Sequence, residues 1–457
     1  MSFVSRNPYD GAELARFPAW SAERIDQAIA AAAKSQPQWA ARPLHERCLY
    51  LRRLAVVLRG EREALATLAT GEMGKRLVEA RAEVDKCALL CEHYATEAEK
   101  LLADEVIETD AARSLVRVHP LGTVLAVMPW NFPFWQVFRC AVPALLAGNA
   151  VLLKHAANVP QCALAIERLF HEAGIDEPLF ATLMIRADQV AGVIRDPRVQ
   201  AVSLTGSEQA GRQVAAVAGE ALKPSLLELG GSDAFVVLED APIEHTVSQA
   251  LASRFQNNGQ SCIAAKRFIV LDAVAEEFVS RLAAGAAELL PGDPMDPDCR
   301  LGPLARPDLR DELHEQVTDA VKQGASLLCG GAPTPESHAG YPATVLDGVT
   351  ADMRAWDEEL FGPVASIIRV PDEETAIEAA NATRFGLGGS VWTADAQRGA
   401  RLASRLACGC AFVNGMVRSD PRLPFGGIRD SGYGRELGKP GLTAFANLQT
   451  LWIGRDA

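Results

Sequence analysis

The feature that most constrains the fold of this chain is a repeated alternation of short apolar runs with helical patterns. The runs are bounded by turn residues and form two sets, at 124–128, 150–153, 180–185 and 201–204, then at 234–238, 268–271 and 364–370. Amphipathic segments such as 159–173 and 243–255 separate most of them. Because parallel strands need a long crossover, usually a helix, this order predicts an α/β fold with parallel sheets.

Three further segments complete the predicted organisation. Residues 22–100 are Ala-rich and charged with helical periodicity, which predicts a helical lead-in. A Gly-Gly-Ser turn near 228–233 separates the two α/β sets. The segments 114–118 and 448–453 look like strands outside both sets, and they could form an exposed ribbon that seeks a partner.

Composition excludes several classes of protein. The chain has 457 residues, 49% of them hydrophobic, so it should divide into two or three domains. Its net charge of -13 gives it no electrostatic reason to bind nucleic acid or an anionic membrane. The N-terminal residues lack the apolar core of a signal peptide, and no apolar run approaches the length of a membrane span. A cytoplasmic protein is expected, with mostly buried thiols and no metal site.

Among the 10 cysteines, Cys262 has the setting that a nucleophile needs. A catalytic thiolate must be accessible and stabilised, which favours a loop over a buried strand. Cys262 ends the polar, glycine-containing turn FQNNGQSC, between a helical pattern and the strand at 268–271. The other cysteines are interpreted as small buried hydrophobic residues.

Two polar residues in apolar surroundings are further candidates. Glu228 is flanked by leucines, and such surroundings raise the pKa of a carboxylate towards that of a useful general base. A buried glutamate held by backbone donors would look the same. Asn131, among the aromatic residues and prolines of MPWNFPFW, presents an amide donor that suits an oxyanion hole, although the segment could equally be an aromatic core turn.

Together these segments resemble the aldehyde dehydrogenase family over essentially the whole chain. The matching pieces occur in the family's order: PWNFP at 129–133, Lys154 after a strand, TGS at 205–207, ELGG at 228–231, GQSC at 259–262, ELFGP at 359–363 and PFGG at 424–427. The resemblance implies two Rossmann-like three-layer α/β domains with a small β-ribbon for oligomerisation. The expected parts are a dinucleotide-binding domain (1–104 and 121–228), a catalytic domain (229–436) and the ribbon (105–120 and 437–457).

The resemblance implies covalent oxidation of an aldehyde, with Cys262, Glu228 and Asn131 as catalytic residues. Cys262 attacks the aldehyde carbon, and the oxyanion is held by the Asn131 side chain and the Cys262 backbone N–H. Hydride passes to a nicotinamide, which leaves a thioester, and Glu228 activates the water that releases the acid. Relatives that transfer the acyl group to CoA generally lack this glutamate, so its presence favours hydrolysis.

The resemblance also implies a variant of the dinucleotide-binding fold. The chain has no G-x-G-x-x-G, and residues 206–213 are a near miss to a P-loop that lacks its lysine, which disfavours ATP. The expected cofactor contacts come from a helix start under the pyrophosphate, from a lysine on the adenosine ribose and from the nicotinamide end: Gly206, Ser207, Lys154, Pro129, Trp130, Ala157, Leu229, Glu359 and Phe361.

Ala157 bears on the choice between NADP and NAD. Many NAD-preferring members carry a glutamate at this position, and without it a 2′-phosphate is not repelled. The serine typical of strongly NADP-dependent relatives is absent too, so either cofactor is expected.

Arg139 directs the prediction of the substrate. It follows Trp135 by one helical turn and matches a position that lines the family's aldehyde tunnel, where an arginine suits a distal carboxylate. An arginine in a structural ion pair is the alternative. Ser419 matches a serine that contacts the carboxylate in succinate-semialdehyde dehydrogenases. The substrate site is expected to include two more residues, Ser261 and Phe425.

One departure qualifies the substrate prediction. Gln256 stands where many succinate-semialdehyde enzymes carry a second arginine, although a bacterial subgroup resembling this chain acts on the same substrate. We therefore expect NAD(P)-dependent oxidation of succinate semialdehyde by a homodimer or homotetramer. The alternatives are a broad-specificity aldehyde dehydrogenase, a non-catalytic homologue, or a cysteine hydrolase, which would need a histidine partner for Cys262.

Overall fold

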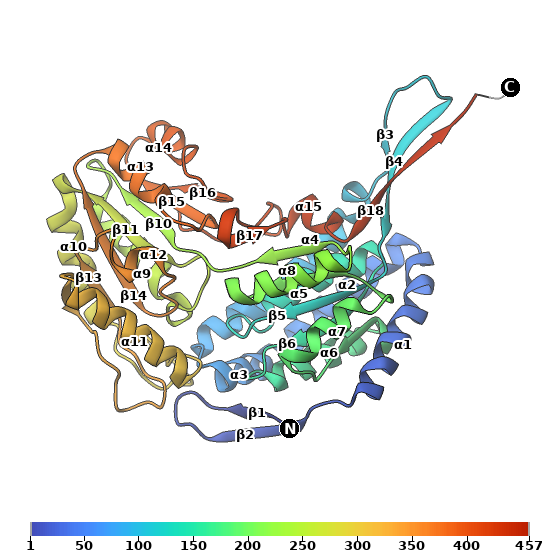
Figure 1. Cartoon of the computed structure of the whole chain (residues 1–457), viewed down its shortest axis with the longest axis horizontal. Coiled ribbons are helices and arrows are strands. Elements are labelled where there is room, and N and C mark those ends of the chain that lie inside the picture. Colours follow the sequence, from blue (N-terminus) through green and yellow to red (C-terminus); the bar gives the residue numbers. More distant parts are fainter. Residues whose placement is uncertain (1, 456–457) are drawn as a thin grey trace.

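A six-stranded sheet forms the centre of the first half of the chain in the computed structural model, which describes residues 2–455 (Figure 1). Its order is β17-β9-β8-β5-β6-β7, and all neighbours are parallel except β17 with β9. The strands are β5 (Thr123–Met128), β6 (Ala150–His155), β7 (Phe180–Thr182), β8 (Val199–Thr205), β9 (Ser225–Glu228) and β17 (Gly432–Tyr433).

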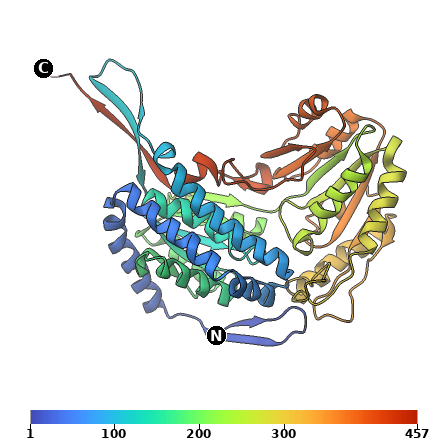
Figure 2. The ribbon, with the colours of Figure 1, turned by 180° about the vertical axis from the view of Figure 1, so that it is seen from behind.

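Helices cover this sheet. The predicted helical lead-in at 22–100 is confirmed. The lead-in contains α1 (Ala22–Ala41), α2 (Leu44–Gly60), α3 (Arg62–Met73) and α4 (Leu77–Leu101). The crossovers are α5 (Trp135–Ala147), α6 (Pro160–Glu172), α7 (Val190–Arg195) and α8 (Glu208–Glu220). Helices α2 and α4 pack against α5, which packs against β5 and β6, and the blue helices lie in front of the first sheet in Figure 2. The contact between α4 and α5 carries side chains of α4 towards the site described below.

A seven-stranded sheet forms the second half, in the order β12-β13-β14-β11-β10-β15-β16. It is parallel except between β12 and β13. The strands are β10 (Asp233–Val237), β11 (Ala265–Leu271), β12 (Ser326–Cys329), β13 (Thr344–Asp347), β14 (Val364–Val370), β15 (Gly388–Trp392) and β16 (Cys410–Val413). The helices are α9 (Ile243–Phe255), α10 (Asp272–Ala287), α11 (Pro307–Lys322), α12 (Arg354–Asp357), α13 (Glu373–Asn381) and α14 (Ala396–Ala403).

Alternate residues of β10 show why its sequence is apolar after Asp233. Ala234 and Val236 belong to a core cluster shared with α11, α13 and α14, whereas Phe235 and Val237 belong to a cluster shared with α9 and α10. A strand buried on both faces needs apolar residues at every position. The predicted three-layer α/β architecture is therefore confirmed.

The two strands predicted outside both domains pair with each other. β4 (Arg113–Pro120) and β18 (Ala446–Ile453) run antiparallel, with Val118 opposite Leu448, and β3 (Glu105–Val106) adds a third strand. This ribbon projects from the body of the molecule in Figure 1. Leu448 and Trp452 are 60% and 56% exposed, so the ribbon carries apolar side chains into solvent.

Strand β17 departs from the predicted division of the chain. It lies within 229–436, which was predicted to be catalytic, yet it pairs with β9 of the first sheet. A Cβ at Gly432 would lie 2.1 Å from the Leu227 carbonyl oxygen, and Gly432 has a φ of 101°, so a glycine permits this close approach. The short helix α15 (Gly438–Thr443) then packs against α5. The hairpin of β1 (Ser2–Arg6) and β2 (Glu13–Pro18) was not predicted either.

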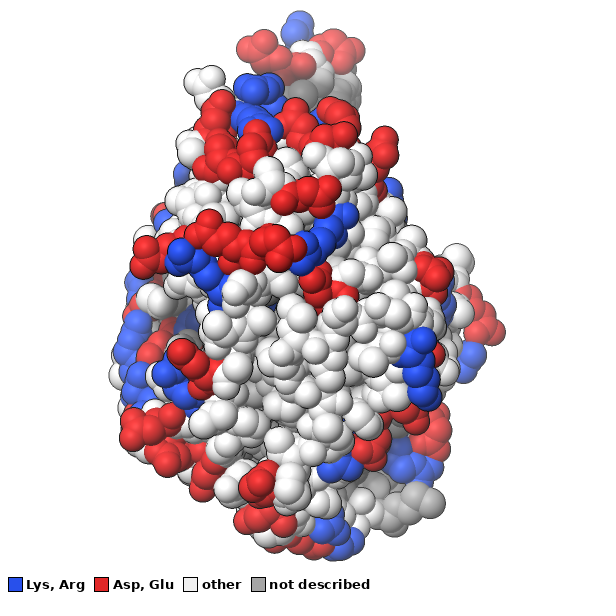
Figure 3. Space-filling view, turned by 90° about the vertical axis from the view of Figure 1, so that its left-hand side faces the viewer, with Lys and Arg blue, Asp and Glu red and all other residues white. Residues whose placement is uncertain are grey.

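Surface charge agrees with the acidic composition. Figure 3 shows acidic and basic side chains interspersed around an uncharged area at the end of the molecule formed by the second sheet and its helices. None of the helices in the described part of the chain has the length and apolar character needed to cross a membrane.

Candidate active site

Two cavities meet at Cys262. A cavity of about 660 Å³ lies between the two sheets' domains, and one of about 220 Å³ lies between α4, α5 and the loop around Ser419. Cys262 and Gln136 line both. A thiol at such a junction can contact two ligands, one in each cavity.

The larger cavity contains nearly all of the residues predicted to bind the cofactor. Those in its lining are Pro129, Trp130, Lys154, Gly206, Ser207, Leu229, Glu359 and Phe361. Ala157 is exposed and does not line the cavity, whereas its neighbour Ala156 does. The predicted role of Ala157 in cofactor choice stays a prediction.

The start of helix α8 makes this cavity suitable for a dinucleotide. Ser207 is the N-cap, and its hydroxyl accepts a hydrogen bond from the Ala210 N–H at 3.4 Å. Free backbone N–H groups and the helix dipole at such a terminus attract phosphate. Leu229 packs so closely on Gly211 that a Cβ there would lie 2.6 Å from its methyl carbons. The half-buried Lys154 adds a cation, whose pKa is lowered by burial.

The loop that carries Cys262 is held by buried amides. Asn257 and Asn258 adopt left-handed backbone conformations with φ of 50° and 57°. The Asn257 amide donates to the Asn131 carbonyl oxygen at 2.7 Å, and the Asn258 amide donates to the Gly74 carbonyl oxygen at 2.9 Å. Strained residues of this kind persist where surrounding contacts fix them, typically at functional sites.

Burial raises the pKa of the Cys262 thiol to about 12, although the cations of Arg139 and Lys266 lower it. The resting thiol is therefore protonated at neutral pH. A nucleophilic thiolate requires a base that removes this proton.

Asn131, the predicted oxyanion-hole donor, contacts the loop that carries Cys262. Its side chain is 4% exposed, and it lines the larger cavity together with Cys262. Its amide donates to the Gln260 carbonyl oxygen at 3.1 Å, so its direction is fixed before a ligand arrives. A preorganised donor of this kind stabilises developing negative charge without rearrangement.

Glu228, the predicted general base, has a pKa suited to accepting a proton near neutral pH. It ends β9, is 1% exposed, and has its pKa raised to about 8 by burial, an effect that Arg139 opposes and Glu436 supports. Among the described residues that line the two cavities, Glu228 is absent, so its side chain must turn towards Cys262 to act on a ligand. A carboxyl with this pKa can exchange protons near neutral pH.

Arg139 lines the smaller cavity as predicted, but its charge is shared by two buried carboxylates. Its guanidinium Nη2 lies 3.4 Å from Glu228 Oε2, and its Nε pairs with Glu436. The guanidinium also stacks on the Phe425 ring, 4.7 Å from the centroid. Contact of Arg139 with a substrate carboxylate stays a prediction. Glu436 was missed because nothing in its local sequence marks it as buried.

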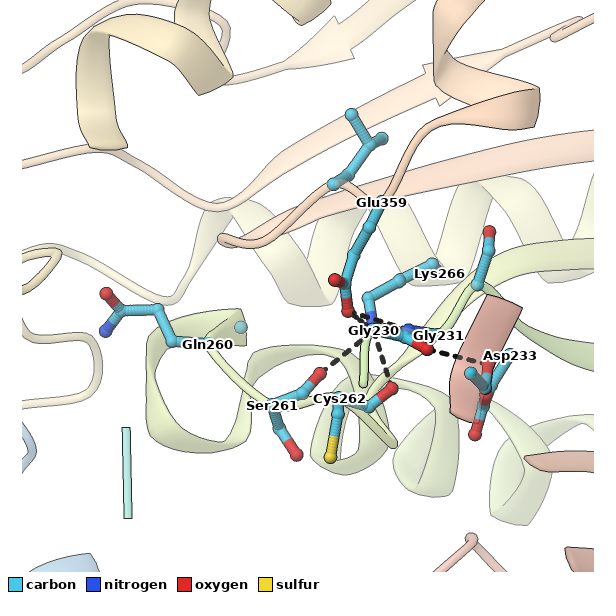
Figure 4. A network of polar contacts seen from close by, with 12 residues as sticks. Gly230, Gly231, Asp233, Gln260, Ser261, Cys262, Lys266 and Glu359 are labelled. Atoms are coloured by element: carbon cyan, nitrogen blue, oxygen red, sulfur yellow. Dashed lines mark hydrogen bonds and ion pairs between the residues drawn. The ribbon is translucent and has the colours of Figure 1, made fainter. Parts of the chain in front are cut away.

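Lys266 and Glu359 form a second buried network behind the nucleophile (Figure 4). The Lys266 ammonium donates to the carbonyl oxygens of Ser261 and Cys262, at 2.9 and 2.8 Å. It also pairs with Glu359 at 3.0 Å, and Glu359 accepts from the Gly231 N–H at 3.1 Å. This network fixes the loop backbone and connects it to the predicted nicotinamide end. Lys266 and its neighbour Arg267 are charged residues at the start of a strand that is otherwise apolar, a signal that the sequence carries.

The smaller cavity contains all the residues predicted to bind substrate. Its lining includes Trp135, Arg139, Ser261, Ser419 and Phe425. It also includes Lys86 of α4, which the sequence analysis missed.

Within residues 2–455, no group of three or more His, Cys, Asp or Glu is arranged to hold a metal ion, and all the cysteines are free.

Comparison with known proteins places this geometry in a family. Residues 1–451 match the model of the aldehyde dehydrogenase family. The chain is 47% identical over 453 residues to a probable succinate-semialdehyde dehydrogenase (NADP(+)) of Synechocystis sp., which covers 99% of this chain and 100% of that protein. It is 46% identical to a succinate semialdehyde dehydrogenase (NAD(P)+) of Escherichia coli, with 99% and 98% covered.

A solved structure gives the same result. The crystal structure of succinic semialdehyde dehydrogenase from Streptococcus pyogenes in complex with NADP+ is 37% identical, covers 99% of this chain and 100% of its own, and superposes with a TM-score of 0.97. Since the family model matches nearly the whole chain and relatives of nearly equal length are 46–47% identical to it, this chain belongs to the aldehyde dehydrogenase family.

Proposed function

We propose that this protein oxidises succinate semialdehyde to succinate with NADP or NAD. The observation that carries the proposal is the position of Cys262, shared by a cavity with a helix start suited to phosphate and a smaller cavity with cations at its wall. The relatives named above, with the same substrate in their names, support it.

The residues of this chain perform the covalent steps. Glu228 takes the proton of the Cys262 thiol, and the thiolate sulfur attacks the aldehyde carbon to form a C–S bond. Asn131 and the Cys262 backbone N–H hold the oxyanion. Loss of the aldehyde hydrogen as hydride leaves a thioester on Cys262. Glu228 passes the first proton to solvent and then takes a proton from the water that attacks the thioester carbon. The C–S bond breaks to release the acid, and Glu228 returns its proton to the departing thiolate of Cys262.

The larger cavity fits the dinucleotide that this reaction requires. Ser207 and Gly206 at the start of α8 would hold the pyrophosphate, Lys154 the adenosine ribose, and Glu359 the nicotinamide ribose. When bound, the nicotinamide ring accepts hydride.

A panel of aldehydes tests the assignment. We expect kcat/KM for succinate semialdehyde to exceed that for butanal of the same chain length, because only the former can use the cations of the smaller cavity. Equal values for the two aldehydes would instead support the broad-specificity alternative. Running the panel with each cofactor measures the preference for NADP over NAD.

Asn131→Ala should lower kcat by about 100- to 1000-fold, because one preorganised donor to the oxyanion is lost. Alkylation of Cys262 by iodoacetamide should persist, since the thiol remains. Steady-state kinetics and labelling by mass spectrometry measure the two effects. A kcat near that of the parent protein would exclude Asn131 from the oxyanion hole.

The exposed ribbon supports assembly into a homodimer or homotetramer. Trp452→Asp combined with Leu448→Asp should shift the mass in light scattering towards the 48.9 kDa monomer, because charge would have to be buried in the contact. Leu222→Asp, at a side chain 93% exposed outside the ribbon, is the matched control. An unchanged assembly in the ribbon variant would contradict this role of β18.

A further inference from the structure

Lys86 is a cation in the wall of the smaller cavity that no step above uses. It projects from α4, is half-buried, and its ammonium donates to the Ser419 hydroxyl at 2.7 Å. The same ammonium lies 4.1 Å from the centroid of the Trp135 ring. Cation–π attraction and a hydrogen bond therefore fix its position between two residues of the predicted substrate site.

The neighbouring charges are already compensated. The pairs are Glu83 with Lys75, Glu79 with Arg76, Asp420 with Arg422, and Arg139 with both Glu228 and Glu436. Across residues 2–455, no carboxylate lies within ion-pair distance of Lys86, whose polar partner is a neutral hydroxyl. Among the described residues of this wall, Lys86 is thus a half-buried cation left without an anion, whereas Arg418, the other cation without an ion pair, is exposed.

A desolvated cation beside a hydroxyl is a binding site for a carboxylate. The ammonium has three donors and uses one on Ser419, and the hydroxyl retains its own hydrogen for an acceptor. Arg139 lacks this freedom, since its single charge serves two carboxylates. An incoming anion near Arg139 would also meet the negative charge of Glu228 or Glu436.

We propose that Lys86 is a specificity-determining residue, whose ammonium binds the distal carboxylate of the substrate together with the Ser419 hydroxyl. This inference rests on the proposed function and names the group that selects a semialdehyde over an uncharged aldehyde. Arg139 acts as a positioning residue, which holds Glu228 through its buried ion pair.

Lys86→Met tests the proposal while keeping the length and apolar stem of the side chain. We expect the ratio of kcat/KM for succinate semialdehyde to that for butanal to fall roughly 10- to 100-fold, through loss of a charge-assisted hydrogen bond, mainly as an increase in KM. Lys86→Arg should recover part of the ratio. Lys100→Met, at an 83% exposed lysine on the same helix, should leave the ratio unchanged.

A pH series provides an independent readout. Burial and the nearby Arg139 lower the pKa of Lys86 to about 8, against the raising effects of Glu83, Cys87 and Asp420. The other charged groups in the cavity wall are Glu79 and Arg418. Only the protonated amine binds a carboxylate, so the ratio should fall as the pH rises through about 8 in the parent protein. In Lys86→Met it should not change with pH, because titration of Cys262 and Glu228 affects both aldehydes alike.

The outcomes separate this inference from the proposed function. If the parent protein does not favour succinate semialdehyde over butanal, the proposed function fails. If the parent favours it and Lys86→Met keeps the full preference, the function stands and the inference on Lys86 is overturned. Arg139→Lys adds a comparison: a similar loss for both aldehydes supports its positioning role, whereas a loss confined to the semialdehyde would transfer the carboxylate site to Arg139.

Discussion

Replacing Cys262 by alanine should abolish aldehyde-dependent reduction of the cofactor, with kcat lowered by on the order of 10⁴-fold or more. The sulfur forms the bond that makes hydride loss favourable, and no neighbouring side chain can replace it. Reduction of NADP is followed by absorbance after mixing enzyme, cofactor and succinate semialdehyde.

Cys329→Ala is the matched control for this variant. Cys329 is partly exposed on β12, at the edge of the second sheet and outside both cavities. We expect its loss to leave kcat unchanged. Full activity in Cys262→Ala would exclude covalent catalysis at this residue, whereas cofactor-independent ester cleavage by the parent protein would revive the hydrolase alternative.

The fold could be predicted where apolar periodicity decides the structure. The predicted strand at 364–370 and helix at 243–255 coincide with β14, an inner strand of the second sheet, and with α9, which packs against that sheet. β12 was missed because most of its side chains are exposed, and β15 begins with two glycines, which are weak strand formers. Strand β17 was missed because its pairing with β9 depends on a long-range return of the chain.

The site could be predicted only as far as its residues carry local signals. Cys262 and Asn131 lie in distinctive segments, and the structure places both in the lining of the larger cavity. Lys86 has no such signal, because a lysine on an amphipathic helix normally faces solvent. Only the packing of α4 on α5 turns it towards Trp135. Arg139 shows the converse case, since its sequence position did not reveal the two carboxylates that surround it.

Glu228→Gln should convert the enzyme into one that still forms the thioester at high pH, where the thiol ionises without a base, but releases the acid slowly. Glutamine keeps the shape of the side chain and removes its basicity, so water loses its proton acceptor and steady-state kcat should fall about 100- to 10 000-fold. Rapid mixing of a preformed enzyme and cofactor complex with substrate should then show a burst of one reduced cofactor per active site. The burst requires a thiolate, so it should be fastest at high pH, where Cys262 ionises without help.

Hydroxylamine tests whether the missing step is hydrolysis. It attacks a thioester without a protein base, forms a hydroxamate and frees the Cys262 thiol, so it should restore turnover in Glu228→Gln. Glu220→Gln, at a 66% exposed side chain at the end of α8, should behave like the parent protein. A variant without a burst and without rescue would show that Glu228 is needed before the thioester, as the base for the thiol alone.

The pH profile distinguishes the two roles of Glu228 further. Its pKa is raised to about 8, chiefly by burial, and only the ionised carboxylate accepts a proton. When hydrolysis limits turnover, kcat should therefore rise with pH through about 8 in the parent protein. In Glu228→Gln this rise of kcat with pH should be absent. A step that survives in the variant would belong to another group, and Glu436, which is buried on the same arginine with its pKa also raised, is the neighbour to replace next.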